Sequence, residues 1–345
     1  MRLDLLNAPR WNATPRPRSG FHEAWYVVAS DARAGHGLWL RYTVDVDRSG
    51  VPALALWGSW FEEGRTFALK NPLLAATIGR SAVAFGPGEL TADGCSGEVE
   101  GKGHTLRWRL RFGQGLPAEE FVPGWLAAVA KLRGGGFVLP HPATTVTGAV
   151  EVDGRMIEMQ RVPAAQAHLW GRRRYPSWAW ARCSAFAEDP GASIDLLDVE
   201  GPAGVRLPLF VFRFRGEMHR FGELPWVARS TSQPQSPSWH FSAQDARLAI
   251  DGVARASPSQ MVQVQYAEPD GSLHHCVNSE IATFELRVRT RAFPGAPWRP
   301  EATLTSKCGA SLEFCGRAPD SRVGNMLVIA ASQQKEASSA GSVAS

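Results

Sequence analysis

Hydrophobic and polar residues alternate with a period of two along much of this chain, which is the pattern of β-strands that bury one face. In residues 105–112, one face carries Leu106, Trp108, Leu110 and Phe112, and arginines occupy the positions between them. Other segments enriched in aromatic and β-branched residues are predicted as strands at residues 25–28, 38–44, 210–215 and 281–289. The pattern therefore favours antiparallel sheets.

Turns and a short helix interrupt these strands. Asp153 and Gly154 stand between two short strand-like segments and predict a tight β-hairpin. Apolar residues at helical spacing, beginning with Trp125, predict a helix over residues 124–133, and the glycines at 134–136 end it. We expect this helix to pack against a sheet.

Many short strands with glycine and proline turns predict an all-β protein made of antiparallel barrels or sandwiches. The sequence contains no strand–helix alternation and no glycine-rich phosphate loop, which disfavours a nucleotide-binding α/β fold. Its 345 residues suggest two such domains. The glycine- and proline-rich stretch 134–142 is the clearest interruption of the strand pattern and a candidate domain boundary. The hairpin at Asp153 can still be the last hairpin of the first domain. We predict an N-terminal domain at 1–160, a C-terminal domain at 161–331 and a disordered tail at 332–345.

Composition and charge limit the partners. The chain is 44% hydrophobic and 20% charged, with a dispersed net charge of +4, so we expect no nucleic-acid partner. No apolar run is long enough to span a bilayer and the N-terminus lacks a signal-peptide pattern, so we predict a cytoplasmic protein without a transmembrane segment. The sequence leaves the oligomeric state open.

Five cysteines occur without a CxxC pair, at positions 95, 183, 276, 308 and 315. An odd number argues against a full disulfide framework, and we expect reduced cysteines. As an alternative, Cys308 and Cys315 can meet across a hairpin.

The densest group of side chains suited to proton transfer or ligand binding lies in residues 166–180. Alternation puts Gln166, His168 and Trp170 on one strand face, where an imidazole can relay a proton near neutral pH. A structural histidine bonded to backbone is the alternative for His168. Aromatic faces suited to an apolar ligand follow at Trp178 and Trp180.

Glu23 is the second candidate for proton transfer. It stands among aromatic residues near the start of the first predicted strand. Such surroundings raise the pKa of a carboxyl and allow it to act as a general acid. The alternative is a carboxylate that pairs with an arginine, for which Arg41 and Arg172 are possible partners.

Arg172 and Asn278 are the candidate polar contacts. Arg172 has the strand parity of His168, so it either binds a carboxylate, enolate or phosphate or forms an internal ion pair. Asn278 shares a face with Cys276 and Glu280, where it either hydrogen-bonds a ligand or the other domain or satisfies a strand edge.

We expect no metal site. His274 and His275 are adjacent and point to opposite strand faces, and the sequence has neither HExxH nor His-x-His. A Gly-x-Ser-x-Gly elbow is also absent from the sequence, which disfavours a serine hydrolase.

Five segments together resemble the two-domain lipocalin-like group that contains tocopherol cyclase, carotenoid 1,2-hydratase, AttH-type proteins and lipocalin-like Diels–Alderases. The matching positions include Glu23, Trp25, His168, Trp170 and Gly171, whereas Ala24 stands where a second aromatic residue often follows the glutamate. The resemblance covers most of residues 20–330. Its segments are Phe21–Tyr26, Leu38–Thr43, Gln166–Gly171, Trp178–Trp180 and Cys276–Ala282.

The resemblance implies two β-barrel-like domains side by side, with a ligand cavity at their junction and no cofactor. One hypothesis is therefore an enzyme that cyclises, hydrates or isomerises an apolar isoprenoid, polyene or polyketide-like substrate. The alternative is a non-catalytic carrier of lipids or pigments. The predicted catalytic residues are Glu23 and His168, and the predicted substrate-binding residues are Trp25, Trp39, Trp170, Arg172, Trp178, Trp180 and Asn278.

Overall fold

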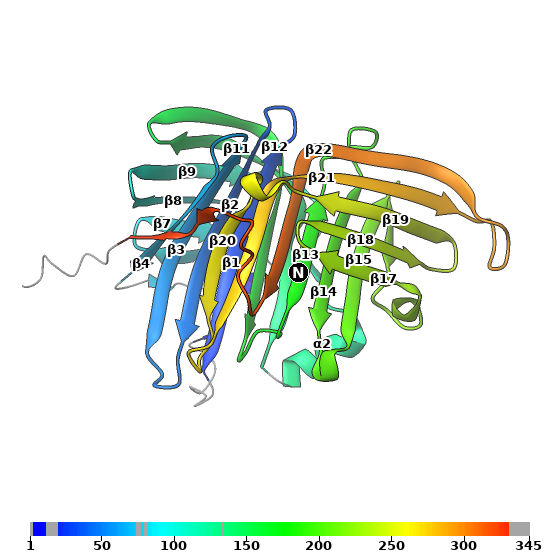
Figure 1. Cartoon of the computed structure of the whole chain (residues 1–345), viewed down its shortest axis with the longest axis horizontal. Coiled ribbons are helices and arrows are strands. Elements are labelled where there is room, and N and C mark those ends of the chain that lie inside the picture. Colours follow the sequence, from blue (N-terminus) through cyan, green and yellow to red (C-terminus); the bar gives the residue numbers. More distant parts are fainter. Residues whose placement is uncertain (1–2, 12–19, 74–76, 79–81, 133, 331–345) are drawn as a thin grey trace, which may run out of the picture.

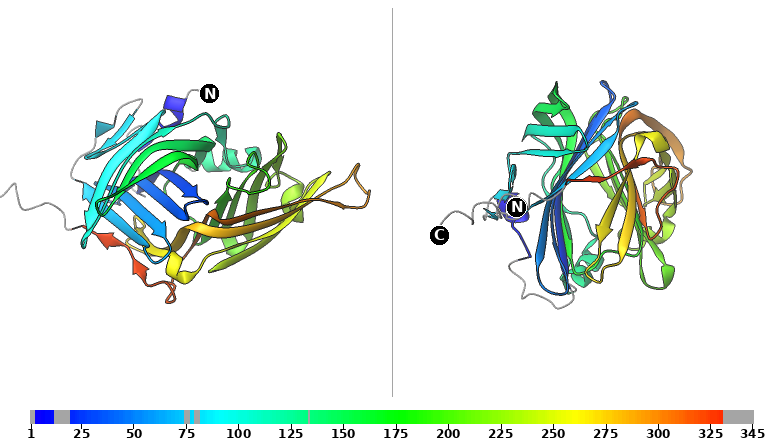
Figure 2. Two further views of the ribbon diagram at one scale, coloured as in Figure 1. Left: turned by 90° about the horizontal axis from the view of Figure 1, so that it is seen from above. Right: turned by 60° about the vertical axis from the view of Figure 1, so that its left-hand side comes forward.

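Strands, most of them antiparallel, make up more than half of the computed structural model, which describes residues 3–11, 20–73, 77–78, 82–132 and 134–330 (Figure 1). In this part of the chain they form a 13-stranded and an 11-stranded sheet. Each sheet curls into a half-barrel, and the two half-barrels lie side by side (Figure 2). The predicted all-β class with two barrel-like units is confirmed.

The first sheet contains, in chain order, β1 (Phe21–Asp31), β2 (His36–Val46), β3 (Pro52–Glu62), β4 (Phe67–Leu73), β5 (Thr77–Ile78), β6 (Ala82–Phe85), β7 (Gly88–Thr91), β8 (Gly94–Gly101), β9 (His104–Phe112), β10 (Glu119–Glu120), β11 (Gly136–Val152), β12 (Arg155–Gly171) and β24 (Val328–Ile329). The strands β1 and β12 pair at its centre.

The second sheet contains β13 (Trp178–Cys183), β14 (Ser193–Glu200), β15 (Arg206–Phe214), β16 (Glu217–Arg220), β17 (Thr231–Gln235), β18 (Ser238–Gln244), β19 (Leu248–Arg255), β20 (Val262–Ala267), β21 (Leu273–Thr290), β22 (Arg299–Gly316) and β23 (Asn325–Met326). The helical elements are α1 (Leu3–Leu6), α2 (Gly124–Leu132) and the 3₁₀ turns η1 (Pro202–Gly204), η2 (Trp226–Arg229) and η3 (Pro258–Gln260).

Local patterns predicted the strands well. In β9, Leu106, Trp108 and Leu110 are buried and the intervening arginines are exposed. Asp153 and Gly154 have φ of 49° and 81° and connect β11 to β12, as the predicted hairpin requires. The stretch 134–142 was expected to interrupt the strands, but most of it belongs to β11. Register shifts near His141 accommodate its two prolines.

The predicted helix forms as α2 and contacts β11 of the first sheet. Trp125 and Val129 are 38% and 41% exposed, whereas Ala127 is buried. The Trp125 indole donates a hydrogen bond to Gly222 O at 3.1 Å, so its polar edge is anchored while much of its ring stays in solvent.

Three apolar clusters hold the fold together: one inside each half-barrel and one between the sheets. In the first half-barrel, Tyr42 is fully buried and its hydroxyl lies 2.9 Å from Ser96 O, across the curl of the sheet. The layer between the sheets includes Trp57 and Tyr266, whose ring centroids are 5.8 Å apart. Both half-barrels therefore share one buried wall.

The chain leaves the first sheet at Gly171 and enters the second at Trp178. After β23, which pairs with β20 in the second sheet, the chain returns to the first sheet, where β24 pairs in parallel with β4. The domain boundary near residue 160 stays a prediction. The predicted disordered tail, residues 332–345, lies outside the described residues.

The expectation of reduced cysteines is wrong for two of the five. Cys276 and Cys315 face each other in the register of β21 and β22 and form a disulfide. Cys308 and Cys315 both lie on β22, so they cannot meet across a hairpin. A disulfide is more usual in oxidising compartments, and the cytoplasmic location stays a prediction. Among the described residues, no helix is long and apolar enough to cross a membrane.

Close contact between the sheets leads to the first testable prediction. A Cβ added to Gly37 on β2 would lie 2.5 Å from Glu280 Cβ and 2.7 Å from Glu280 O on β21. Gly37→Ala is therefore expected to destabilise the fold by ~1–3 kcal/mol through overpacking. Gly324→Ala is the control, because nothing lies within 4 Å of its added Cβ. Equal midpoints in urea unfolding for the two variants would contradict this account of the junction.

Candidate active site

Glu23 and His168 meet on the paired strands β1 and β12. In their antiparallel register, Glu23 lies opposite Trp170 and Trp25 lies opposite His168. Because side chains alternate across a strand, these four share a face. That face belongs to the interior of the first half-barrel, where Trp25 and Trp170 join the apolar cluster. The side chains of Glu23 and His168 are both 0% exposed.

Hydrogen bonds fix both groups. Glu23 Oε1 lies 2.7 Å from His168 Nε2 and accepts the Arg10 N–H at 2.8 Å. Glu23 Oε2 accepts the Trp11 N–H at 2.9 Å. The other ring nitrogen, His168 Nδ1, lies 2.6 Å from Leu6 O. Neither Arg41 nor Arg172 is a partner of Glu23 in these contacts.

These contacts determine where the protons lie. A carbonyl oxygen can only accept, so His168 Nδ1 carries a proton and donates it to Leu6 O. The contact between His168 Nε2 and Glu23 Oε1 holds one further proton, on either atom. The pair has no net charge in both cases, which allows two titratable groups to be buried together. The geometry provides a proton donor at His168 Nδ1, while the Glu23 carboxylate contacts the other ring nitrogen, Nε2.

The N-terminal residues 3–11 cover this pair. Asn7 O accepts a hydrogen bond from Trp25 Nε1 at 3.1 Å, and Asn7 Oδ1 accepts one from Gln166 Nε2 at 2.8 Å. Sequence reasoning missed this segment, because its residues lack strand periodicity and a recognisable motif. Its role follows from contacts with Glu23 and Trp25 on β1 and with Gln166 and His168, more than 100 positions away, on β12.

Aromatic rings enclose the imidazole. Trp25 stacks on His168 with ring centroids 4.6 Å apart and an interplanar angle of 12°. Trp170 lies 4.8 Å from the imidazole on a tilted plane. The Arg10 guanidinium lies 5.1 Å from the centroid of the Trp170 ring. An aromatic face at this site therefore already holds a cation.

The remaining predicted tryptophans belong to the opposite face, in the layer between the sheets. Trp178 Nε1 donates to Glu313 Oε1 at 2.6 Å. Trp180 packs edge-on against Tyr26, and Trp39 against Trp57. Asn278 lies in the same layer, is 2% exposed and pairs in register with Glu313. The predicted site residues thus form two groups on opposite faces of β1 and β12, and the cavity predicted at the domain junction stays a prediction.

Arg172 lies outside both groups. The strand ends at Gly171, so the parity argument that placed Arg172 beside His168 no longer applies, and Arg172 is exposed. Arg174 instead enters the junction, where Nη2 contacts Asp45 Oδ1 at 2.7 Å and Nη1 contacts Glu268 Oε1 at 3.1 Å. Burial raises the pKa of Glu268, but hydrogen bonds with His274 and Arg174 outweigh it and hold that pKa at about 2.

Two further carboxyls lie in the junction layer. Burial raises the pKa of Glu280 well above its usual value, the Ser311 hydrogen bond lowers it, and the neighbouring Glu313 raises it again. Burial likewise raises the pKa of Glu313, against a hydrogen bond from Trp178. Among the described residues, no group of three or more His, Cys, Asp or Glu side chains could hold a metal ion. The expected absence of a metal and a cofactor stays a prediction.

Comparisons with known proteins place these features in context. Residues 107–312, more than half of the chain, match the family model described as tocopherol cyclase-like. A search of curated proteins found no match.

Solved structures share the fold at low identity. A putative AttH protein from Nitrosomonas europaea is 11% identical, with a TM-score of 0.52 over 86% of this chain and 93% of that chain. Kievitone hydratase from Nectria haematococca is 8% identical, with a TM-score of 0.51 over 92% and 95%. CghA is 10% identical, with a TM-score of 0.52 over 87% and 88%.

The buried Glu280 carboxyl yields a pH-dependent prediction. Its pKa is raised on folding, so the free energy of unfolding falls as the pH rises from the unfolded-state value, about 4.3, toward the folded-state value. Glu280→Gln removes this loss of stability, because the amide does not ionise. The amide oxygen can still accept the hydrogen bond from Ser311. The Tm of the variant should exceed that of the parent at pH 7.5, and the difference should shrink toward pH 4.

The control is Glu285→Gln, on the same strand but exposed. Its Tm difference from the parent is expected to stay small at both pH values. A Glu280→Gln difference that does not change between pH 4 and 7.5 would contradict the raised pKa.

Proposed function

Because the chain belongs to the tocopherol cyclase-like family, we propose that it is a cofactor-independent cyclase, hydratase or isomerase. Its substrate would be an apolar isoprenoid, polyene or polyketide-like molecule. The observation that carries this proposal is the 2.7 Å contact between His168 Nε2 and Glu23 Oε1, with the opposite ring nitrogen already donating to an oxygen. This arrangement makes His168 the proton donor and Glu23 the residue that holds the imidazole in position.

The substrate reaches His168 when residues 3–11 move aside. In the closed arrangement, Leu6 O occupies the position in front of His168 Nδ1. The segment is held to the site by single hydrogen bonds, each contributing about 0.5–1.5 kcal/mol net. An apolar substrate that takes this place lies against the Trp25 and Trp170 rings that enclose the imidazole.

Proton transfer then starts the reaction. The π electrons of a substrate alkene take the Nδ1 proton, a C–H bond forms, and the N–H electron pair stays on the imidazole. The neighbouring carbon becomes a cation, and the Glu23–His168 pair becomes a single negative charge beside it. The faces of Trp25 and Trp170 stabilise this cation, at the position where the Arg10 guanidinium now lies over Trp170.

The group that attacks the cation determines the product. A second alkene or a substrate hydroxyl closes a ring, water gives a hydrated product, and loss of a proton alone gives an isomer. In each case the proton released returns to His168 Nδ1 and restores the neutral pair. Holding a flexible chain in a reactive conformer is worth up to ~7–11 kcal/mol, and the proton donor adds roughly 10²–10⁴-fold.

A non-catalytic carrier of lipids or pigments is the second candidate. The observation that favours it is that Glu23 and His168 have all their polar atoms bonded to one another or to the N-terminal segment. A pair with a purely structural role would look the same. A carrier would return its ligand chemically unchanged, which separates the two candidates.

The test combines a neutral double substitution with product analysis. Replacing both members of the pair, Glu23→Gln with His168→Gln, leaves no uncompensated buried charge and is expected to lower turnover by roughly 10²–10⁴-fold. Turnover is measured by mass spectrometry on a panel of acyclic isoprenoids, as products isomeric with the substrate or heavier by one water. In D₂O, each cyclised or hydrated product should carry one new C–D bond.

The matched control is a second carboxylate–histidine contact, His219 Nδ1 to Asp245 Oδ2 at 2.7 Å in the other half of the molecule. Asp245→Asn with His219→Gln should leave turnover at the parent level. If the Glu23 and His168 variant keeps full turnover, or if every ligand is returned unchanged, the acid–base mechanism is wrong.

A further inference from the structure

The hairpin that connects β21 to β22 ends in an apolar turn. Residues 292–298, here called the hairpin tip, read Ala-Phe-Pro-Gly-Ala-Pro-Trp and contain no charged side chain. Phe293 is 63% exposed, and Ala292, Pro294 and Pro297 are exposed beside it. The hairpin, drawn in orange, projects beyond the rest of the second half-barrel in Figure 1 and in the left view of Figure 2. The protein itself therefore does not cover the tip.

The backbone of the tip is suited to an apolar environment. Polar backbone groups that enter such an environment must be paired. The Ala296 N–H donates to Phe293 O at 3.0 Å, and Pro294 and Pro297 have no N–H to pair. Gly295 has a φ of 93°, which this close turn requires and which glycine adopts without strain.

Arginines surround the base of the tip. Between residues 286 and 300 the chain has four arginines, at 287, 289, 291 and 299, and no acidic residue. Arg247 joins them from the turn between β18 and β19, because its carbonyl oxygen accepts the Arg291 N–H at 2.9 Å. Arg299 follows the tip directly and is exposed, as is Arg247.

Arg291 is fixed at this base without being neutralised. Its Nε and Nη2 donate to the backbone oxygens of Ala246 and Asp245, at 2.8 and 3.3 Å. Its guanidinium lies 4.3 Å from the centroid of the Trp298 ring. Backbone oxygens and a ring hold the group in position and leave its positive charge uncompensated.

The charges of Arg247 and Arg299 are also uncompensated. Neither forms an ion pair in the part of the chain that the structure describes. Asp245 and Glu301, two positions away from them along the chain, contact a histidine and a different arginine. Three unpaired positive charges therefore lie next to an uncovered apolar turn.

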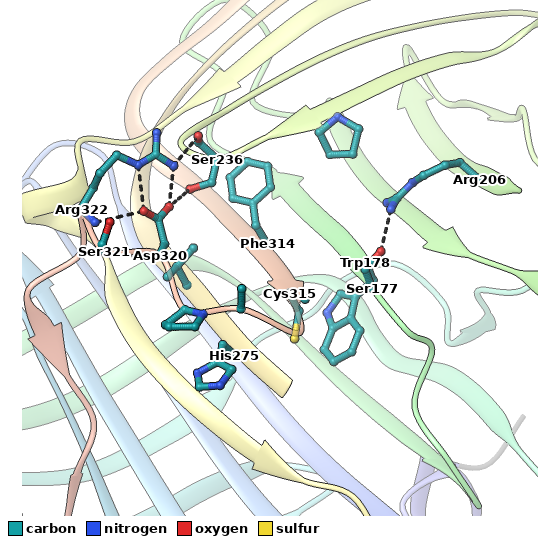
Figure 3. Close-up of a pocket in the computed structure, with 15 residues that line it drawn as sticks. Ser177, Trp178, Arg206, Ser236, His275, Phe314, Cys315, Asp320, Ser321 and Arg322 are labelled. Carbon is teal, nitrogen blue, oxygen red and sulfur yellow. Dashed lines mark hydrogen bonds and ion pairs between the residues drawn. The ribbon is translucent and has the colours of Figure 1, made fainter. Parts of the chain in front are cut away.

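Other arginines of the second half-barrel are paired with carboxylates. Arg322 contacts both carboxylate oxygens of Asp320, at 2.8 and 2.6 Å, beside a cavity of about 450 Å³ (Figure 3). Further from the tip on the same hairpin, Arg287 and Arg289 both contact Asp251. The lack of carboxylate partners is thus a feature of the arginines at the tip.

From this arrangement we infer that the hairpin tip docks on lipid bilayers that contain anionic lipid. Phe293 enters the region of the headgroups, and Arg247, Arg291 and Arg299 contact the lipid phosphates. A protein partner fits less well, because a stable protein interface buries about 800 Å² on each side. A narrow projection of seven residues offers little area of that kind, whereas a fluid bilayer closes around it.

Cosedimentation of the full chain with vesicles tests this inference. Binding to phosphatidylcholine vesicles that contain roughly 30% phosphatidylglycerol should exceed binding to pure phosphatidylcholine by about tenfold or more, and added salt should reduce the difference. Phe293→Ser should weaken binding to the anionic vesicles by roughly tenfold, because it removes the inserted ring.

Arg299→Gln should weaken binding to the anionic vesicles by roughly fivefold and leave binding to phosphatidylcholine unchanged. Two variants are matched controls. Val205→Ser removes an apolar side chain that is 65% exposed in another loop of the second half-barrel, and Arg33→Gln removes an exposed arginine from the first half-barrel. Both should bind as the parent does. Thermal unfolding verifies that each variant is folded, as expected for changes at exposed positions.

The inference is wrong if the parent binds neither kind of vesicle, if it binds both equally, or if Phe293→Ser binds the anionic vesicles like the parent. Equal losses in Val205→Ser and Phe293→Ser would also overturn it, since binding would not then depend on the tip. The measurement involves no turnover and leaves Glu23 and His168 intact, so it is independent of the proposed catalytic function.

Discussion

Strand β1 is buried on both faces, and the rest of the structure depends on this constraint. One face packs inside the first half-barrel and the other packs against the second sheet, so water reaches neither. Every polar side chain on it must find an internal partner or remain neutral. Glu23 has His168 and two backbone N–H groups. His22, on the other face, stays neutral, because burial and the Arg174 charge lower its pKa.

The same constraint explains how far the sequence predicts the site. Alternation correctly places Gln166, His168 and Trp170 on one face, since the period of two is a local property of a strand. It does not say which face meets which neighbour when both are buried. Trp25 and Trp39 were therefore assigned to one pocket, although they lie in different apolar clusters on the two sides of the sheet.

Strand and turn positions were predictable because their causes are local. The β9 alternation and the hairpin at Asp153 depend on a few neighbouring residues. The Cys276–Cys315 disulfide, 39 residues apart, depends on the register of β21 and β22, which no short pattern encodes. Arg172 shows the limit of the method, because parity has meaning only until the strand ends at Gly171.

In the proposed reaction, a substrate must displace the N-terminal segment from Glu23 and His168. At Glu23 and His168, the chain's own backbone already makes the contacts that a substrate oxygen or a backbone-like group would make, and Arg10 provides a cation over Trp170. Opening therefore exchanges several hydrogen bonds of about 0.5–1.5 kcal/mol each for burial of apolar substrate surface, at about 25 cal/mol per Å². The five hydrogen bonds named above amount to about 2.5–7.5 kcal/mol, which roughly 100–300 Å² of buried apolar surface balances, so the proposed opening favours a sizeable apolar molecule. A small polar molecule buries too little apolar surface to balance these bonds, which agrees with the apolar substrate proposed above.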